Sequence, residues 1–492
     1  MAMAYDYDMI VIGGGAAGLT SSGIAANFGA KTMMIERHRL GGDCTWTGCV
    51  PSKTILKTAR VAHHIRCAAE YGLTAQALTF DFAQMMGRLR RIREEVYEEA
   101  DAPALYEQMG IDVRFGAAHF ADPHTVVIEG EDGTARFTAR YMAIAAGASA
   151  FVPPIEGLET VPYLTNETLF EITEQPRRMV IVGGGPIGTE MAQAFARLGT
   201  QVTVIQRGDT ILPKDDPELT ALLLARLQQE GIRYRFNADA KKVARSAGHL
   251  AIEVERNGVR EVLEADALLV ATGRRPNLDG LNLEAAGVAY TRRGITVDDR
   301  CRTNRRHIYA IGDVTGRYQF THMSEHMGKV AASNALFKIP LKIDTKHVPW
   351  VTFTDPELAH VGAREQDLRQ RGTAYTVYRF PYTKIDRAVT DAEATGLIKV
   401  FARAWNGKIL GATILGASAG DMICEYALAM RNGVTLRHIS DTIHPYPTYG
   451  LGVRRAADQW YAQKQSTTLI RLLQQVFGYR GPVIEPDPDR IV

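Results

Sequence analysis

Residues 8–18 of this chain read DMIVIGGGAAG, an apolar run that ends in a glycine-rich turn. The run predicts a buried strand, followed by a helix through Phe28 and a second strand over 31–35 that ends at Glu36. In such a βαβ unit the glycines let the backbone approach a pyrophosphate, and an acid after the second strand accepts a hydrogen bond from a ribose 2′-OH. The residues predicted to bind this first dinucleotide are Gly13, Gly15, Gly18 and Glu36.

The pattern recurs at residues 178–188, RMVIVGGGPIG, with a helix through Leu198 and a strand over 201–205. The position that corresponds to Glu36 holds Gln206, followed by Arg207. Loss of the acid and gain of a guanidinium favour a 2′-phosphate, so this turn is predicted to prefer NADPH, with NADH as the alternative. The alternative that Arg207 is only a solvated residue at the end of a strand stays open. The residues predicted to bind this second nucleotide are Gly183, Gly185, Gly188, Gln206, Arg207 and Gly273.

Between the two turns, residues 41–53 read GGDCTWTGCVPSK, with cysteines five positions apart at the start of a predicted helix. A pair at this spacing closes a small disulfide loop, and such a dithiol accepts and donates two electrons. The alternatives are a structural disulfide and half of a zinc site, which needs a second pair of ligands. Two nucleotide sites around Cys44 and Cys49 favour an electron path from nicotinamide through flavin to the disulfide.

The composition is that of a globular enzyme of more than one domain. The chain has 492 residues, 46% of them hydrophobic and 23% charged, with a net charge of +2, which gives no argument for a nucleic-acid or acidic partner. The first residues lack a signal-peptide pattern, and no apolar stretch is long enough for a membrane span. One close cysteine pair and three scattered cysteines predict a cytoplasmic protein with a catalytic dithiol.

The other elements are predicted from periodicity and turn residues. Residues 81–108 predict a long charged helix, and residues 139–147 a buried strand. A short buried strand at 308–311 ends in Gly312-Asp313, whose carboxylate can meet the ribityl hydroxyls of a flavin. The chain after 346 alternates strands and helices as an α+β domain, and residues 465–492 hold one short amphipathic piece and a Pro/Asp-rich end.

Together these motifs resemble the FAD-dependent pyridine nucleotide-disulfide oxidoreductases, the family of dihydrolipoamide dehydrogenase, glutathione reductase and mercuric reductase. The resemblance covers about residues 6–465 and implies an α/β fold with two Rossmann-like dinucleotide-binding domains, for FAD and NAD(P), plus a C-terminal α+β dimerisation domain. The expected parts are FAD-binding segments 1–150 and 279–345, the NAD(P)H-binding domain 151–278, the interface domain 346–465 and the tail 466–492.

The resemblance also implies roles for single residues. Cys49 is expected to be the charge-transfer thiolate that faces FAD, and Cys44 the thiol that exchanges with the acceptor. Lys53 is expected to pair with Glu190 near the flavin. Gly147 and Asp313 are expected to bind FAD, and the partner subunit of a homodimer to complete the active site.

One part of the family pattern is broken. Disulfide-reducing members carry a histidine before Pro-Thr and a glutamate five positions later, and this pair protonates the leaving thiolate. Here Tyr446 and Leu451 occupy those positions, and His444 lies two positions earlier without an acid at the expected offset. Mercuric reductase resembles the chain at this spot, although no cysteine follows Cys424 to form its C-terminal Cys-Cys pair.

The sequence therefore leaves three readings. The leading one is an NADPH-dependent flavin and dithiol reductase of a soft metal ion such as Hg(II), with Cys44, Cys49 and Tyr446 as ligands of the substrate metal. The second is a reductase of a lipoyl or low-molecular-weight disulfide, with His444 or Tyr446 as the acid. The third is a redox-sensing or metal-binding flavoprotein without turnover.

Overall fold

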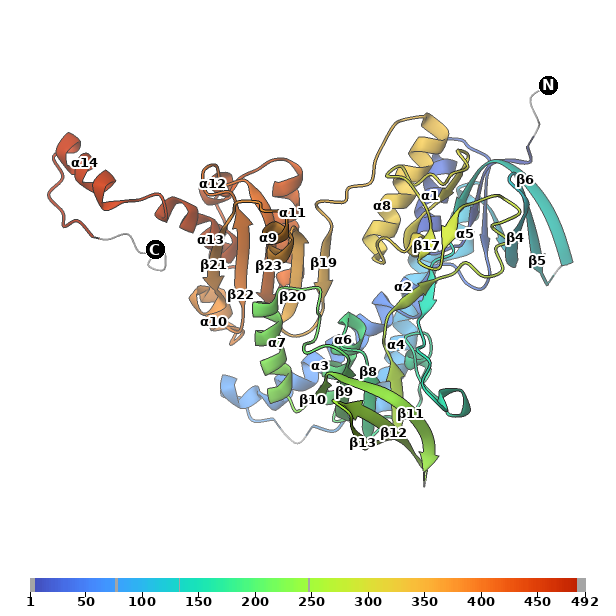
Figure 1. Cartoon of the computed structure of the whole chain (residues 1–492), viewed down its shortest axis with the longest axis horizontal. Coiled ribbons are helices and arrows are strands. Elements are labelled where there is room, and N and C mark those ends of the chain that lie inside the picture. The colour runs from blue at the N-terminus through green and yellow to red at the C-terminus, as the bar shows by residue number, and fades with distance from the viewer. Residues whose placement is uncertain (1–4, 76–77, 132, 247, 485–492) are drawn as a thin grey trace. The chain divides into compact units, whose positions relative to one another are not determined.

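The computed structural model describes residues 5–75, 78–131, 133–246 and 248–484 (Figure 1). The chain divides into two compact units, one of residues Met1–Asp209 with Ile232–Ile343, the other of Thr210–Gly231 with Asp344–Val492. Residues 210–231 lie inside the predicted nucleotide-binding domain, yet they group with the C-terminal part. This division into two units does not test the domain boundaries predicted from the sequence, which remain a proposal.

The first unit contains a sheet built on the first glycine turn. Its order is β3-β2-β1-β6-β5-β4, with β18 also paired to β6, and β1, β2, β3, β6 and β18 run parallel. The bounds are β1 Tyr7–Ile12, β2 Thr32–Glu36, β3 Asp112–Phe115, β4 Ala117–Asp122, β5 Thr125–Gly130, β6 Gly133–Ile144 and β18 Ile308–Ala310. Helix α1 (Ala16–Asn27) follows the turn and packs against α8 (Thr321–Ala332).

The second glycine turn builds a parallel sheet of the same strand order, β10-β9-β8-β14. The bounds are β8 Arg178–Val182, α6 Pro186–Arg197, β9 Gln201–Gln206, β10 Arg233–Phe236 and β14 Ala267–Val270. An antiparallel sheet of β11 (Ala238–Ser246), β12 (His249–Arg256) and β13 (Val259–Ala265) follows β10. In both parallel sheets the strand after the crossover lies next to the first strand, as in a dinucleotide-binding fold.

The second unit is an antiparallel sheet of order β19-β20-β23-β22-β21, packed against helices. The strands are β19 Pro349–Thr352, β20 Glu357–Gly362, β21 Thr376–Pro381, β22 Leu397–Ala402 and β23 Ile409–Gly416. Helices α11 (Ala419–Arg431) and α13 (Leu451–Ala462) share one apolar core with the sheet, and α12 is Leu436–Asp441. The sheet and helices match the predicted α+β arrangement.

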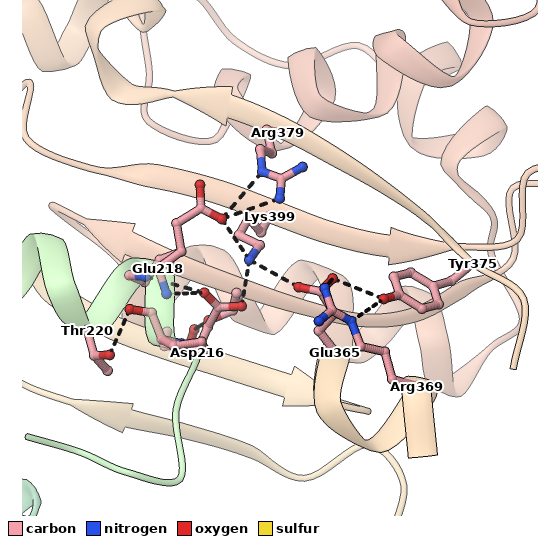
Figure 2. A network of polar contacts seen from close by, with 12 residues as sticks. Asp216, Glu218, Thr220, Glu365, Arg369, Tyr375, Arg379 and Lys399 are labelled. Atoms are coloured by element: carbon pink, nitrogen blue, oxygen red, sulfur yellow. Dashed lines mark hydrogen bonds and ion pairs between the residues drawn. The ribbon is translucent and has the colours of Figure 1, made fainter. Parts of the chain in front are cut away.

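A buried lysine joins α7 (Pro217–Gln229) to this sheet (Figure 2). Ile398 and Val400 of β22 belong to the apolar core, and Lys399 between them points to the opposite face because strand side chains alternate. The Lys399 side chain is 2% exposed, and its Nζ lies 2.7 Å from Asp216 and 3.4 Å from Glu365. Asp216 also caps α7 by accepting the backbone N–H groups of the first turn.

The predicted long helix over 81–108 is wrong. The structure has α4 (Phe82–Val96), a π-helical turn at Tyr97–Asp101 and a separate α5 (Pro103–Gln108). Pro103 has no N–H and disfavours the helical conformation at the residue before it, so Ala102 is extended and the helix ends.

The amphipathic piece of the tail forms α14 (Thr467–Phe477), which has no buried residue. Its exposed apolar side chains are Leu469, Leu472, Leu473, Val476 and Phe477. The end of the Pro/Asp-rich stretch, residues 485–492, lies outside the described residues. Over the described ranges, no helix is both long and apolar enough to cross a membrane.

Candidate active site

The two cysteines lie on consecutive helices of the first unit. Cys44 is in α2 (Gly42–Trp46), and Cys49 is the first residue of α3 (Cys49–Arg66). A side chain at Gly48 would meet the carbonyl oxygen of Asp43 at 2.8 Å, so the turn between the helices needs a glycine. Both cysteines are free thiols, and a hydrogen bond joins them.

The two thiols differ in acidity. The hydrogen bond from Cys44 lowers the pKa of Cys49 to about 6 against the opposing effect of burial, and the Thr321 hydroxyl and Lys53 lower it further. The same hydrogen bond, with burial, raises the pKa of Cys44. At neutral pH the negative charge is therefore on Cys49 and the proton is on Cys44.

Two helix N-termini meet at the Cys49 sulfur. Cys49 opens α3, and Thr321 opens α8 with its Oγ1 3.4 Å from the Cys49 Sγ. The positive end of a helix dipole stabilises a nearby anion. Sequence reasoning missed Thr321, which lies 272 residues from Cys49 and carries no motif.

Lys53 and Glu190 form the ion pair expected of them. Lys53 lies one helical turn after Cys49 on the same face of α3, and its Nζ is 3.1 Å from the Glu190 Oε2 on α6. The Glu190 side chain is 7% exposed and that of Lys53 39%. The pair therefore differs from one between two solvated residues, although its role beside a flavin stays a prediction.

The two glycine turns have the same internal geometry. Glu36 accepts the N–H of Gly14 at 2.7 Å, and Gln206 accepts the N–H of Gly184 at 2.9 Å. A Cβ on Gly13 would lie 2.3 Å from the backbone carbonyl oxygen that follows β6. A Cβ on Gly183 would lie 2.3 Å from the one that follows β14. A Cβ on Gly18 or Gly188 would lie within 2.0 Å of the carbonyl oxygen of Gly13 or Gly183. Only glycine permits this close packing of strand and helix.

Other glycines of the predicted sites border open space. A Cβ on Gly185, Gly147 or Gly273 would have no neighbour within 4 Å, and one on Gly15 would meet only the Cα of Gly42, at 3.6 Å. Gly15 and Gly185 are the N-cap residues of α1 and α6, and bare backbone at a helix N-terminus is what a pyrophosphate requires. The residues present therefore fit FAD at the first turn and a nicotinamide dinucleotide at the second.

Asp313 lies in a buried charge cluster. It belongs to the short helical turn Gly312–Thr315 after β18, and burial raises its pKa. The Arg274 Nε is 3.5 Å from its carboxylate, and the same guanidinium pairs with Asp43, the residue before Cys44. Arg274 was not singled out from the sequence, although it follows Gly273 directly.

Trp46 lies between the two cysteines and packs the segment that carries them against α4. Its indole N–H donates to the carbonyl of Leu40 at 2.8 Å, and the guanidinium groups of Arg39 and Arg93 lie over its ring. Arg93 also donates to the Trp46 carbonyl at 3.0 Å. These contacts give the tryptophan a positioning role that the sequence did not reveal.

The C-terminal candidates belong to the second unit. His444 is 8% exposed, and its two ring nitrogens each lie 3.0 Å from an acceptor, the Thr442 carbonyl and the Glu425 carboxylate. Sequence reasoning found no acid for this histidine, and α11 supplies Glu425. Tyr446 is 69% exposed, and its hydroxyl donates at 2.9 Å to Asp386, which raises the pKa of the phenol.

Comparisons with known proteins agree with this geometry. The sequence model for "Pyridine nucleotide-disulphide oxidoreductase" matches residues 7–328, and the model for the dimerisation domain of the same family matches 348–457. A mercuric reductase of Lysinibacillus sphaericus is 37% identical, over 92% of this chain and 82% of the relative. A dihydrolipoyl dehydrogenase of Bacillus subtilis is 34% identical, over 92% of this chain and 96% of the relative.

A solved structure is also similar. The Cu(II) complex of HOCl-induced flavoprotein disulfide reductase RclA from Escherichia coli superposes with a TM-score of 0.83 at 27% identity, over 93% of this chain and 99% of the other. Among the described residues, no group of three or more His, Cys, Asp or Glu is arranged to hold a metal ion. The predicted fold class and enzyme class are confirmed, and the chain belongs to the FAD-dependent pyridine nucleotide-disulphide oxidoreductases, which use NAD(P)H.

Proposed function

We propose that this enzyme takes electrons from NADPH, passes them through FAD to the Cys44–Cys49 disulfide, and delivers them to a soft metal ion such as Hg(II). The observation that carries the proposal is the unequal thiol pair of Cys44 and Cys49, together with the fact that His444 already uses both ring nitrogens for hydrogen bonds inside the second unit. A thiolate at Cys49 suits a soft metal, whereas reduction of a disulfide needs a proton donor for the leaving thiolate.

The described residues support each step of this proposal. The first glycine turn, Glu36 and Asp313 would hold FAD, which when bound would supply the two-electron chemistry between nicotinamide and disulfide. Two electrons and one proton convert the disulfide into the Cys49 thiolate and the Cys44 thiol, and the Cys44–Cys49 hydrogen bond holds that proton. Binding of Hg(II) between both sulfurs would release the Cys44 proton to water. Transfer of two electrons from the two thiolates to the metal would then give Hg(0) and re-form the Cys44–Cys49 disulfide.

The charges around the dithiol support this sequence. The Cys49 thiolate is stabilised by Thr321 and by Lys53, whose own pair with Glu190 keeps the ammonium in place. Arg274 connects Asp313 with Asp43 and so fixes the residue before Cys44. Relatives named mercuric reductase support a soft metal ion as acceptor, and the similar structure from Escherichia coli is a complex with another metal ion, Cu(II).

Reduction of a lipoyl or other small disulfide is the second candidate. The Glu425 carboxylate against His444 favours it, because such a carboxylate orients an imidazole, and relatives named dihydrolipoyl dehydrogenase support it. Both ring nitrogens of His444 already make hydrogen bonds within the subunit, however, and the Tyr446 hydroxyl donates a hydrogen bond to Asp386. A sensing or metal-binding flavoprotein without turnover is the remaining reading.

The proposal includes the nucleotide and the assembly. Gln206 and Arg207 favour NADPH, with NADH as the alternative. The matched dimerisation domain supports a homodimer in which Tyr446 of one subunit joins the cysteines of the other. A cytoplasmic location, predicted from the cysteine usage, belongs to this proposal as well.

The test is reoxidation of the reduced holoenzyme by defined acceptors. The enzyme is reduced with one equivalent of NADPH and mixed with Hg(II) in excess thiol, Cu(II), lipoamide or glutathione disulfide. We expect fast reoxidation by a metal ion and reoxidation by disulfides that is about 10²–10⁴-fold slower. This factor is the rate contribution that a general acid usually makes. Fast lipoamide reduction that survives Tyr446→Phe and is lost in His444→Ala would establish the second candidate instead.

A further inference from the structure

We propose that Asp239 limits how strongly Arg207 selects NADPH over NADH. The inference rests on the proposed role of Arg207 in binding the 2′-phosphate. In the structure the guanidinium is 78% exposed and its Nε–H donates to the Asp239 carboxylate. Asp239 thus already supplies a negative charge beside the guanidinium to which a 2′-phosphate would bind.

The contact follows from the strand arrangement. Phe236 of β10 pairs with Gln206 of β9, and the N–H of Asn237 donates to the carbonyl of Gly208 at 3.0 Å. The chain then enters β11, which places Asp239 beside Arg207. Thirty-two residues separate the two in sequence, so no local motif marks the pair.

The charges near Arg207 are close to balanced. Lys241 is the second cation, with its Nζ 3.5 Å from Asp239 and 3.8 Å from Glu255. Arg260 approaches the same Glu255 at 3.4 Å. The patch is therefore a mixed ion-pair network and lacks the strong positive field that Arg207 alone would give.

A 2′-phosphate carries more than one negative charge at neutral pH. When it binds Arg207, two anions share one guanidinium, and Asp239 repels the phosphate. NADH has a 2′-hydroxyl at this place and meets no such repulsion. Asp239 therefore lowers the efficiency with NADPH and leaves that with NADH nearly unchanged.

Asp239→Asn removes the charge and keeps the shape of the side chain, because asparagine has an oxygen that can still accept the Nε–H bond. We expect the ratio of NADPH to NADH efficiency in flavin reduction to rise about fivefold, the size of one exposed charge interaction. By calorimetry on the holoenzyme, adenosine 2′,5′-bisphosphate should bind tighter by the same factor, and ADP should bind unchanged. The gain should shrink in about 1 M salt, where the screening length falls to about 3 Å.

Asp266→Asn is the matched control. The Asp266 side chain is 34% exposed and that of Asp239 35%, and each pairs with an arginine of this domain. Asp266 contacts Arg178 at the start of β8, whereas the glycine turn follows the end of that strand, so this control should leave both nucleotide ratios unchanged.

Arg207→Ala tests the role of Arg207 in nucleotide selection separately from the role of Asp239. If it leaves the NADPH to NADH ratio unchanged, the nucleotide assignment itself fails. If it lowers the ratio while Asp239→Asn leaves it unchanged or lowers it, the inference about Asp239 is overturned and the carboxylate only orients the guanidinium. If Asp239→Asn raises the ratio equally at low and high salt, its effect is not electrostatic and the inference also fails.

Discussion

At the scale of single residues, the chemistry depends on one proton held between two sulfurs. Cys44 keeps it, and Cys49 carries the charge because Cys44, Thr321 and Lys53 all favour the thiolate there. A buried thiolate needs such partners, since burial alone raises a thiol pKa. The Cys44 hydrogen bond has the largest effect, and Thr321 and Lys53 add to it.

The acidity of Cys49 gives a pH prediction. In the reduced holoenzyme, alkylation of Cys49 by iodoacetamide should be half-maximal at pH about 6 and lost as the pH falls further, because only the thiolate reacts. Thr321→Val should move this midpoint up by about one pH unit, the loss of one charge-assisted hydrogen bond, whereas Thr321→Ser should not. Peptide mass spectrometry separates Cys49 from Cys44, and a wild-type midpoint near 9 would refute the thiolate.

At the scale of elements, β22 carries both the apolar core and a buried charge. Figure 2 shows Lys399 reaching Asp216 and Glu218 on the α7 side and Glu365 on the other, with Arg379 beside Glu218. Removal of one partner from a buried ion pair leaves the rest without compensation, which costs more than the pair itself contributes. Lys399 therefore holds the start of α7 on the sheet of the second unit.

We predict that Lys399→Met destabilises the second unit by about 3–5 kcal/mol. The measurement is the denaturant midpoint of the holoenzyme together with hydrogen exchange of the β22 amides. Arg379→Gln is the control at less than about 1 kcal/mol, because Arg379 is half exposed. Adding Asp216→Asn to Lys399→Met should restore part of the loss, because it removes the 4% exposed carboxylate that has lost its lysine and keeps an oxygen to cap α7. No restoration would argue against this origin.

His360 of β20 predicts a second stability effect. The residue is 1% exposed and its ring packs on Trp350, and burial lowers its pKa to about 4 from an ordinary 6.5. The unfolded chain therefore binds a proton first, so stability is full above pH 6.5 and falls between 6.5 and 4, by on the order of 3 kcal/mol.

Unfolding of wild type and His360→Gln at pH 7 and pH 5 checks this effect. The glutamine variant should start less stable, because the packing on Trp350 is lost, but it should lose less stability between the two pH values. An equal loss in both proteins would show that other groups cause the acid sensitivity.

At the scale of the whole molecule, our proposal is that two chains complete each active site. The cysteines belong to the first unit, Tyr446 belongs to the second, and the second unit matches a family dimerisation domain. In a two-fold homodimer each contact of one residue with a different residue of the partner is repeated with the subunits exchanged, so both sites form in the same way.

Subunit mixing tests the shared site. We expect Cys49→Ser and Tyr446→Phe homodimers to be slow, and the co-expressed heterodimer, purified through two tags, to regain about half of the wild-type activity. The gain arises because one of its two sites carries both native residues. Activity no higher than the mean of the two parents would place Tyr446 and the cysteines in sites that do not combine.

The sequence by itself determined the parts whose geometry is local. Each glycine turn is encoded within about 30 residues by strand, turn and helix signals, and the spacing of Cys44 and Cys49 is fixed by one short turn. Pro103 also ends a helix by a local rule, which the charge pattern of 81–108 concealed. Family membership followed from these motifs because their order along the chain is itself informative.

The tertiary structure alone decided which distant groups meet. Thr321 reaches Cys49, Glu425 reaches His444, and Asp239 reaches Arg207 because strand order and helix packing bring together residues 272, 19 and 32 positions apart. Residues 210–231 join the second unit for the same reason, through contacts such as that of Lys399 with Asp216. The acidity of a thiol and the charge beside a nucleotide depend on such neighbours, and spacing along one chain does not specify them.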